Sequence, residues 1–218
     1  MSGKLRLYDY WRSSAAYRVR IALNLKGLEY ESIPVHLVRN GGEQRHADFL
    51  ALNPQGLIPV LADGERVVRQ SLAIIEYLDE LHPAPPLLPT TSRDRARVRA
   101  LALTVACDIH PLNNLRVMQY LERELGAAEP QRLAWMRHWM AEGLAAFEAQ
   151  VAGHPSTGEF CEGELPGLAD CCLIPQLYNA RRFGMDLSAY PTLLRIEAGC
   201  RELAAFREAA PEAQPDAV

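Results

Sequence analysis

The chain has 218 residues, a hydrophobic share of 49%, a charged share of 23% and a formal net charge of −4. This balance is typical of a globular protein and excludes disordered and fibrous classes. The acidic charge, without a basic stripe interleaved with aromatic residues, argues against nucleic acid or an anionic membrane as the main partner. Because no signal-peptide core and no apolar run of roughly 18 residues occur, we expect a soluble cytoplasmic protein that acts on small molecules.

The cysteines predict neither a disulfide framework nor a metal site. Their number is odd, and no CxxC or Cys/His ligand spacing is present. We therefore expect free thiols and no bound metal. The five positions are Cys107, Cys161, Cys171, Cys172 and Cys200.

The first 81 residues alternate short strands with helical stretches. The order β-α-β-α-β-β-α resembles that of a thioredoxin-like domain, which we place at residues 1–82. The patterns predict strands at Lys4–Tyr8, Glu29–Pro34, Ile58–Ala62 and Arg66–Arg69, and helices at Ser14–Lys26, Gln44–Leu52 and Ser71–Leu81.

A proline-rich linker divides the chain. Segment 82–89 holds four prolines in eight residues, which predicts a stiff, non-helical connection at 83–90. The expected fold class is α/β plus all-α, with a helical bundle domain at 91–210 and a polar tail at 211–218. Helices are expected at Arg93–Gly126, Pro130–Val151, Gly167–Phe183 and Pro191–Glu202, followed by a short turn to Ala209.

Four segments carry polar residues in a fixed order. They are Tyr10–Leu23 (YWRSSAAYRVRIAL), Asn53–Pro59 (NPQGLIP), Gln70–Leu78 (QSLAIIEYL) and Cys107–Asn114 (CDIHPLNN). Together they resemble the glutathione transferase superfamily and, more narrowly, its zeta class, whose known activity is that of a maleylacetoacetate isomerase. The resemblance covers nearly the whole chain. It implies the glutathione-transferase fold, glutathione as cofactor and a homodimer.

Ser13 and Ser14 stand where a strand gives way to a helix. A hydroxyl and free backbone N–H groups can there face one anion at the positive end of the helix dipole. Lowering the pKa of a bound glutathione thiol by about two units takes about 2.7 kcal/mol, which this arrangement can supply. Plain N-capping explains the serines equally well from the sequence alone. The resemblance favours a functional role, with Ser13 preferred over Ser14 as the thiolate donor.

Further glutathione contacts follow from the resemblance. Ile58 precedes Pro59, which is cis in the family and lets the Ile58 main chain pair with the cysteinyl part of glutathione, whereas a trans proline opening a strand is the alternative. Gln70 and Ser71 begin a helix and suit the γ-glutamyl carboxylate, although N-capping also explains Ser71. Gln44 matches a position that reaches the glutathione backbone.

The CDIHPLNN segment adds His110 and Asn114. Pro111 lies between them and removes a helical hydrogen bond, so a kink is expected there. By resemblance, His110 and Asn114 contact glutathione or substrate. A histidine packed between helices is the alternative for His110.

Two arginines match positions that the family uses for substrate carboxylates. Arg12 directly precedes the serines, and Arg182 lies near the end of a predicted helix. For its neighbour Arg181 we expect a solvated position on the helix surface. The arginine fork suits carboxylates. The predicted catalytic set is Ser13, Ser14, Arg12 and Arg182. One departure concerns Ala15, because the zeta signature has cysteine there, which puts rate and substrate preference in doubt.

The resemblance implies a glutathione-dependent isomerase that converts maleylacetoacetate to fumarylacetoacetate in tyrosine and phenylalanine catabolism. A maleylpyruvate isomerase of aromatic degradation fits the same motifs. A transferase that conjugates small electrophiles such as α-haloacids is a second class, and a non-catalytic binding module is a third. The sequence does not choose between the two isomerase substrates.

Overall fold

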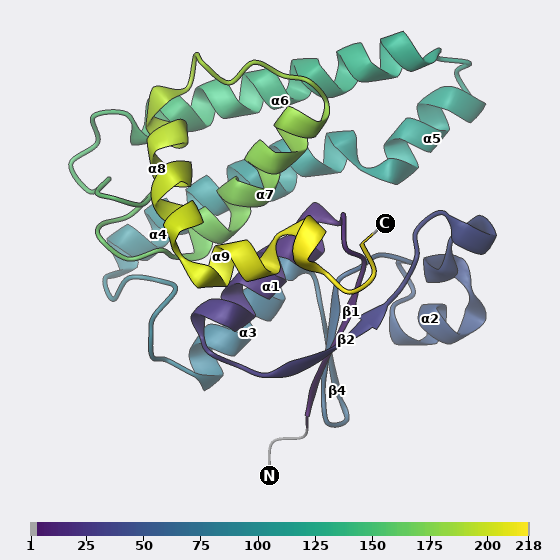
Figure 1. Cartoon of the computed structure of the whole chain (residues 1–218), viewed down its shortest axis with the longest axis horizontal. Coiled ribbons are helices and arrows are strands. Elements are labelled where there is room, and N and C mark those ends of the chain that lie inside the picture. The colour runs from purple at the N-terminus through teal and green to yellow at the C-terminus, as the bar shows by residue number, and fades with distance from the viewer. Residues whose placement is uncertain (1–3, 218) are drawn as a thin grey trace. The chain divides into compact units, whose positions relative to one another are not determined.

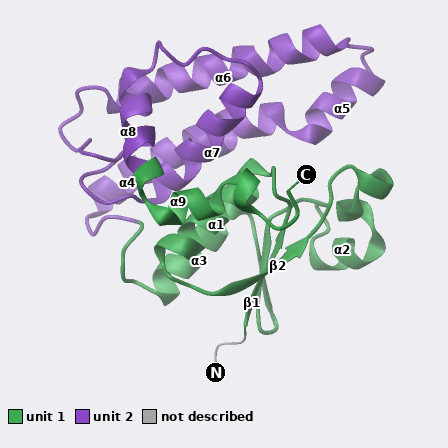
Figure 2. Ribbon diagram, in the orientation of Figure 1, with its two compact units in different colours: residues 1–87, 201–218 green, residues 88–200 purple. Residues whose placement is uncertain are grey.

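The computed structural model describes residues 4–217 and divides into two compact units. Unit 1 comprises residues 1–87 and 201–218, and unit 2 comprises residues 88–200, as coloured in Figure 2. Unit 1 contains a four-stranded mixed sheet with helices, and unit 2 is helical. The expected fold class, a thioredoxin-like part followed by a helical part, is confirmed.

The sheet of unit 1 has the strand order β2-β1-β3-β4. β1 pairs parallel with β2 and antiparallel with β3, and β3 pairs antiparallel with β4. β3 begins two residues later than expected, because Pro59 has no N–H with which to join the ladder. The strands are β1 (Leu5–Asp9), β2 (Tyr30–Pro34), β3 (Val60–Asp63) and β4 (Arg66–Arg69).

Helices cover both faces of this sheet, with α1 and α3 on one side and α2 on the other (Figure 1). Tyr8 of β1 packs its ring 6.2 Å from that of Phe49 on α2. The expected helix 44–52 is divided, because His46 is extended and separates a 3-10 turn at 43–45 from α2. The helices are α1 (Ser14–Leu25), α2 (Ala47–Leu52), α3 (Ser71–Leu81) and α9 (Ala204–Ala209).

The C-terminal segment belongs to unit 1. Along α1, Asn24 Nδ2 donates to the Ala205 carbonyl at 3.0 Å, and Arg20 Nε donates to the Ala209 carbonyl at 2.9 Å. α9 therefore lies beside α1 (Figure 1). The sequence boundaries placed 91–210 in one domain and 211–218 in a tail, whereas contacts group 201–217 with the N-terminal unit, because α1 offers these long-range partners.

Unit 2 is built on buried apolar side chains of its helices. α4 packs on α7, and α5 packs on α6. No helix within residues 4–217 is long and apolar enough to cross a bilayer. The helices are α4 (Ser92–Leu103), α5 (Leu115–Arg123), α6 (Glu129–Val151), α7 (Leu168–Arg182) and α8 (Pro191–Glu202), whose last two residues fall in unit 1.

The continuous helix expected over 93–126 is wrong. α4 ends at Leu103. The chain then forms a π-helical turn at Thr104–Ile109 and a 3-10 turn at His110–Asn113. Asn114 is extended, and α5 begins after it. Pro111 lacks the N–H that an α-helix needs, so the chain does more than kink. The polar residues of this segment consequently lie in a non-α stretch.

Candidate active site

The N-terminus of α1 carries the two predicted serines. Ser13 is the N-cap, and its Oγ accepts a hydrogen bond from the Ala16 N–H at 3.2 Å. Accepting occupies an oxygen lone pair, so the hydroxyl proton stays available for donation to an anion. Ser13 is half-buried and Ser14 is buried, with 8% exposure. Capping and a functional role are therefore compatible in Ser13, the more accessible of the two.

Arg12 stands in the turn that leads into α1. Its guanidinium lies 4.7 Å from the centre of the Trp11 ring, and its Nη2 donates to the Tyr10 hydroxyl at 3.4 Å. Both contacts leave donors of the guanidinium for another partner. The position of the Arg12 side chain thus depends on the two aromatic residues before it.

Ile58 lies just before β3 in a loop with a cis Ile58–Pro59 peptide bond, as the resemblance implies. Its side chain packs against the core cluster of Val35, Phe49 and Val60. The ladder between β3 and β4 starts at the Val60–Arg69 pair, so Ile58 stands outside the paired register. Its main chain is therefore in a place where an extended ligand could pair with it.

Gln44 is buried in the turn before α2, with 6% exposure. Its Nε2 donates to the Leu37 carbonyl at 3.3 Å, whereas its Oε1 is buried and has no hydrogen-bond partner among the described residues. A Cβ at Gly42 would lie 2.9 Å from the Leu37 carbonyl oxygen that binds this amide, and Gly42 has φ of +99°, so glycine is required beside Gln44. An acceptor left buried and unsatisfied is costly, which makes Gln44 Oε1 suited to a ligand donor.

The start of α3 brings together Gln70 and Ser71. Gln70 has φ of +71°, a left-handed conformation that is strained for a non-glycine residue and is often retained at binding sites. Its Nε2 donates to Gln55 Oε1 at 3.0 Å. Ser71 is buried and accepts from Arg18 Nη1 at 3.2 Å. The strained residue therefore presents its backbone at a helix N-terminus with a cationic side chain nearby.

Two helix N-termini of unit 1 carry predicted anion contacts, with Ser13 and Ser14 at the start of α1 and Ser71 at the start of α3. The first turns of α1 and α3 contain no acidic residue. The first backbone N–H groups of a helix have no partner within it, and they favour an anion. A carboxylate or thiolate would therefore be stabilised at either end. Unit 1 carries Arg12, Ser13, Ser14, Gln44, Ile58, Pro59, Gln70 and Ser71, and unit 2 carries His110, Asn114 and Arg182.

In unit 2, Asn114 caps α5, since its Oδ1 accepts from the Arg116 N–H at 3.1 Å. His110 is half-buried in the 3-10 turn before it. Sequence reasoning missed Asn113, whose amide oxygen and nitrogen are both buried without a hydrogen-bond partner among the described residues. Only its place in the CDIHPLNN motif could have drawn attention to it.

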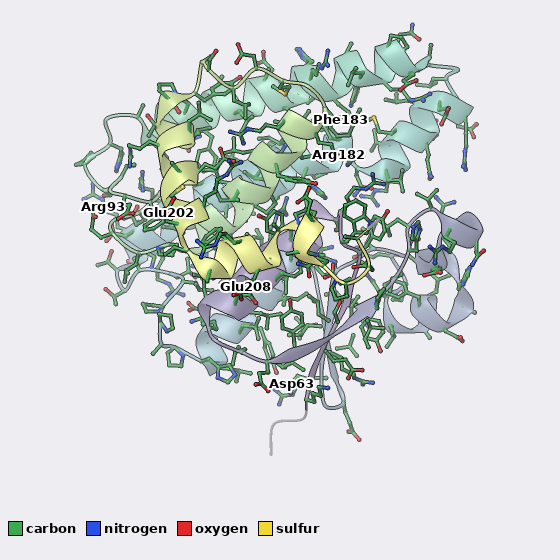
Figure 3. The ribbon with its side chains drawn as sticks, in the orientation of Figure 1. Asp63, Arg93, Arg182, Phe183, Glu202 and Glu208 are labelled. Atoms are coloured by element: carbon green, nitrogen blue, oxygen red, sulfur yellow. The ribbon has the colours of Figure 1, made fainter. Side chains whose placement is uncertain are left out.

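The arginine pair at the end of α7 has two distinct environments. Arg181 forms a bidentate ion pair with Glu197 of α8, in which the Nη2–Oε2 distance is 2.5 Å. Arg182 is exposed and lies over the Phe183 ring at 4.9 Å (Figure 3). Arg181 is exposed, as expected for a helix-face residue, and it also pairs with the buried Glu197. Arg182 keeps its charge at the surface.

Asp170, in the first turn of α7, has a structural role. Its carboxylate accepts from the Gly167 N–H at 2.8 Å and from the Cys161 N–H at 2.9 Å. Burial raises the pKa of Asp170, and the two N–H donors oppose that rise. Within residues 4–217, no group of three or more His, Cys, Asp or Glu side chains is arranged to hold a metal ion.

Similarity to known proteins agrees with this geometry. Residues 7–86 match the family described as "Glutathione S-transferase, N-terminal domain". A probable maleylacetoacetate isomerase of Vibrio cholerae is 58% identical over 213 residues, which cover 98% of both chains. The structure of a bacterial zeta-class glutathione S-transferase, a maleylpyruvate isomerase, superposes with a TM-score of 0.95 at 50% identity over 98% of this chain and 100% of that one.

A third comparison concerns a protein with ligands bound. The crystal structure of a maleylacetoacetate isomerase from Methylobacterium extorquens AM1 contains malonate and glutathione. It superposes with a TM-score of 0.94 at 44% identity and covers 98% of this chain and 99% of that one. Sequence identity of 44% to 58% over nearly the full length is far higher than the identity expected of proteins that share only a fold. The chain therefore belongs to the glutathione transferase family, within its zeta class.

Proposed function

We propose that the protein is a glutathione-dependent cis–trans isomerase that converts maleylacetoacetate to fumarylacetoacetate, in the catabolism of tyrosine and phenylalanine. The observation that carries the proposal is the N-terminus of α1. There the half-buried Ser13 hydroxyl only accepts a hydrogen bond from the described residues, so its proton can be donated to a ligand, and the first turn lacks acidic residues. That place stabilises a thiolate. The zeta-class relatives named as isomerases support the reaction type.

The residues of unit 1 fit glutathione. The buried and unpartnered Gln44 Oε1 can accept from a peptide N–H, and the Ile58 main chain lies outside the sheet ladder. Gln70 and Ser71 offer a helix N-terminus to the γ-glutamyl carboxylate. Glutathione is bound in related structures, which supports the same cofactor here. We assign His110 and Asn114 of unit 2 to contacts with glutathione or substrate.

When bound, glutathione supplies a thiolate whose reversible addition turns a conjugated double bond into a single bond free to rotate, and it is not consumed. Ser13 donates a hydrogen bond that lowers the pKa of that thiol, with the first-turn N–H groups of α1 adding to the effect. Arg12 and Arg182 each bind a carboxylate and offset the negative charge that develops on the substrate. Ser14 supports the same helix start.

A maleylpyruvate isomerase is the second candidate, because a relative of that name is 51% identical over 97% of this chain. Turnover of maleylacetoacetate and maleylpyruvate, each with and without glutathione, decides between them. If the protein isomerises neither substrate, the proposal is wrong. Net loss of free thiol with α-haloacids would indicate a conjugating transferase, and absence of a glutathione thiolate absorbance band would indicate a binding module.

Two further expectations belong to this proposal. Zeta-class resemblance supports a homodimer, which sedimentation of the purified chain tests directly. The reaction uses a cytosolic thiol, so we propose a cytoplasmic location. Both rest on the family and on the chemistry of the cofactor.

A further inference from the structure

The turn before α1 is held by hydrogen bonds from distant parts of the chain. Ser13 N donates to the Tyr10 carbonyl at 2.8 Å, which closes a turn with Trp11 and Arg12 at its centre. Such a turn leaves the backbone groups of its central residues without a partner inside the turn. Trp11 is buried, so its N–H and carbonyl need partners from elsewhere in the protein.

Both Trp11 backbone groups find such partners. The carbonyl accepts from Arg20 Nη2 at 2.9 Å, and the N–H donates to Asp216 Oδ2 at 3.1 Å. Arg20 is fully buried on α1. Asp216 lies 205 residues further along the chain, in the C-terminal segment. The turn that carries Arg12 and Ser13 is therefore held from α1 on one side and from the C-terminus on the other.

The C-terminal segment itself is fixed on unit 1. Arg20 Nε donates to the Ala209 carbonyl at 2.9 Å, so the same guanidinium binds both the turn and the end of α9. Buried Gln214 donates through Nε2 to the carbonyls of Glu208 at 2.8 Å and Ala210 at 2.9 Å. Asp216 thus approaches Trp11 along a defined path.

We propose that Asp216 is a positioning residue, which holds the Trp11 backbone so that Arg12 and Ser13 are presented at the start of α1. The proposal rests on the proposed roles of Arg12 and Ser13. The Arg12 guanidinium stacks on the Trp11 ring, so a shift of Trp11 moves the arginine as well. A hydrogen bond to a charged acceptor is among the stronger ones in proteins, so one carboxylate can hold such a turn.

Electrostatics agree with this arrangement. Burial raises the pKa of Asp9, Arg20 opposes the rise, and the charge of Asp216 adds a smaller rise. The Asp9 and Asp216 carboxylates therefore lie within electrostatic reach of each other. Asp9 binds Arg20 directly, with Nη1–Oδ distances of 2.8 and 2.9 Å, whereas Asp216 binds the turn.

Three variants of the full-length chain test the proposal. Asp216→Ala removes the acceptor, Asp216→Asn keeps an acceptor oxygen, and Glu208→Ala removes an exposed carboxylate from the same segment as a control (Figure 3). At saturating glutathione, we expect Asp216→Ala to lower kcat/KM for the keto acid by about tenfold, mainly through KM. Asp216→Asn, which keeps a neutral acceptor, should restore part of this loss, and Glu208→Ala should match the wild type.

Amide hydrogen exchange gives a readout that does not need activity. Peptides containing Trp11 should exchange faster in Asp216→Ala than in the wild type or in Glu208→Ala. Unchanged exchange and unchanged kcat/KM would overturn the proposal, as would an Asp216→Asn protein as impaired as Asp216→Ala. A loss of activity that disappears when each variant is assayed equally far below its Tm would assign Asp216 to stability alone and also overturn it.

The proposed function can fail separately. If the wild type isomerises neither substrate, the reaction assignment is wrong. The exchange experiment then still reports whether Asp216 holds the turn.

Discussion

The Lys26 ammonium and the Asp79 carboxylate form a buried ion pair between the end of α1 and the end of α3. The same ammonium donates to the carbonyls of His82 at 2.7 Å and Pro85 at 2.5 Å, and Asp79 Oδ1 accepts from the Leu87 N–H at 2.8 Å. One pair therefore fixes the proline-rich segment against unit 1. Proline stiffness alone would not set the direction of this segment.

Loss of one partner of this pair should be costly. We expect Lys26→Met to lower the free energy of unfolding by about 3–5 kcal/mol in urea titrations, because it leaves a buried carboxylate without its counter-ion. Lys26→Met combined with Asp79→Asn should recover part of the loss. Lys4→Met breaks the exposed Lys4–Glu31 pair at 3.6 Å and serves as the control, with an effect below about 1 kcal/mol. Equal losses in both single variants would contradict the burial argument.

Ser13 and Ser14 should differ in kinetics. We expect Ser13→Ala to reduce glutathione-dependent isomerisation about 10²-fold and to raise the pKa of bound glutathione thiol, since the donor to the thiolate is lost. Ser14→Ala, which changes a buried hydroxyl, should have a smaller effect on that pKa. Thiolate absorbance measured against pH gives the comparison. A Ser13→Ala protein with the wild-type thiol pKa would be incompatible with the proposed role.

Substitution of the two arginines at the end of α7 should have different effects, with Arg182 affecting substrate binding and Arg181 affecting stability. Arg182→Ala should raise KM for the keto acid by about 10- to 100-fold with little change in Tm, because an exposed cation is lost. Arg181→Ala should instead lower the free energy of unfolding by about 1–3 kcal/mol, because Glu197 is left buried. Steady-state kinetics and urea unfolding of both variants provide the test. The reverse pattern would mean that the two assignments are exchanged.

Gly143 of α6 sits against Ile109 of the π-helical turn. A Cβ at Gly143 would lie 2.2 Å from Ile109 Cγ1, so Gly143→Ala should destabilise by about 1–3 kcal/mol. Adding Ile109→Ala should make the glycine substitution less costly in a double-mutant cycle. Gly199→Ala is the control, because its Cβ would meet only the end of the Glu159 side chain at 3.3 Å. Additive effects of the Gly143 and Ile109 changes would argue against this contact.

Buried thiols should make stability fall in alkaline solution. Burial raises the pKa of Cys161 and Cys200, with the charge of Asp170 adding to the rise in both. Above about pH 8.5 these cysteines ionise only in the unfolded chain, which then binds fewer protons than the native state. The free energy of unfolding should fall by up to about 1.4 kcal/mol per pH unit for each thiol. Urea midpoints between about pH 8 and 10 measure this slope, and Cys200→Ala should reduce it.

The same environments predict which thiol reacts. Cys107 is exposed, whereas the other four cysteines are buried, and none of the five forms a disulfide. An alkylating reagent should label Cys107 in the native protein and the others only after unfolding. Mass spectrometry of the peptides identifies the labelled site. Fast native labelling of Cys200 would contradict its burial.

Local patterns were enough for much of the fold. The predicted helices Ser71–Leu81 and Pro191–Glu202 and the strand Arg66–Arg69 have the bounds that the structure shows, because each is bounded by its own turn or proline signal. Motifs in the sequence also predicted the family, and the resemblance to that family implied the cis bond before Pro59. The roles given to the site residues stay predictions for the experiments above.

Contacts between distant parts of the chain could not be predicted from local sequence patterns. Helical periodicity continues past Leu103, yet the chain forms a π-helical turn at Thr104–Ile109, and Ile109 lies directly against Gly143 of another helix. Arg181 and Arg182 are adjacent and identical in type, and no local pattern predicted that Arg181 pairs with Glu197 of another helix. The sequence by itself determined the family and the serine at the start of α1. Only the tertiary structure decided that Asp216 binds the turn before that serine, because a bond across 205 residues depends on how α9 packs along α1.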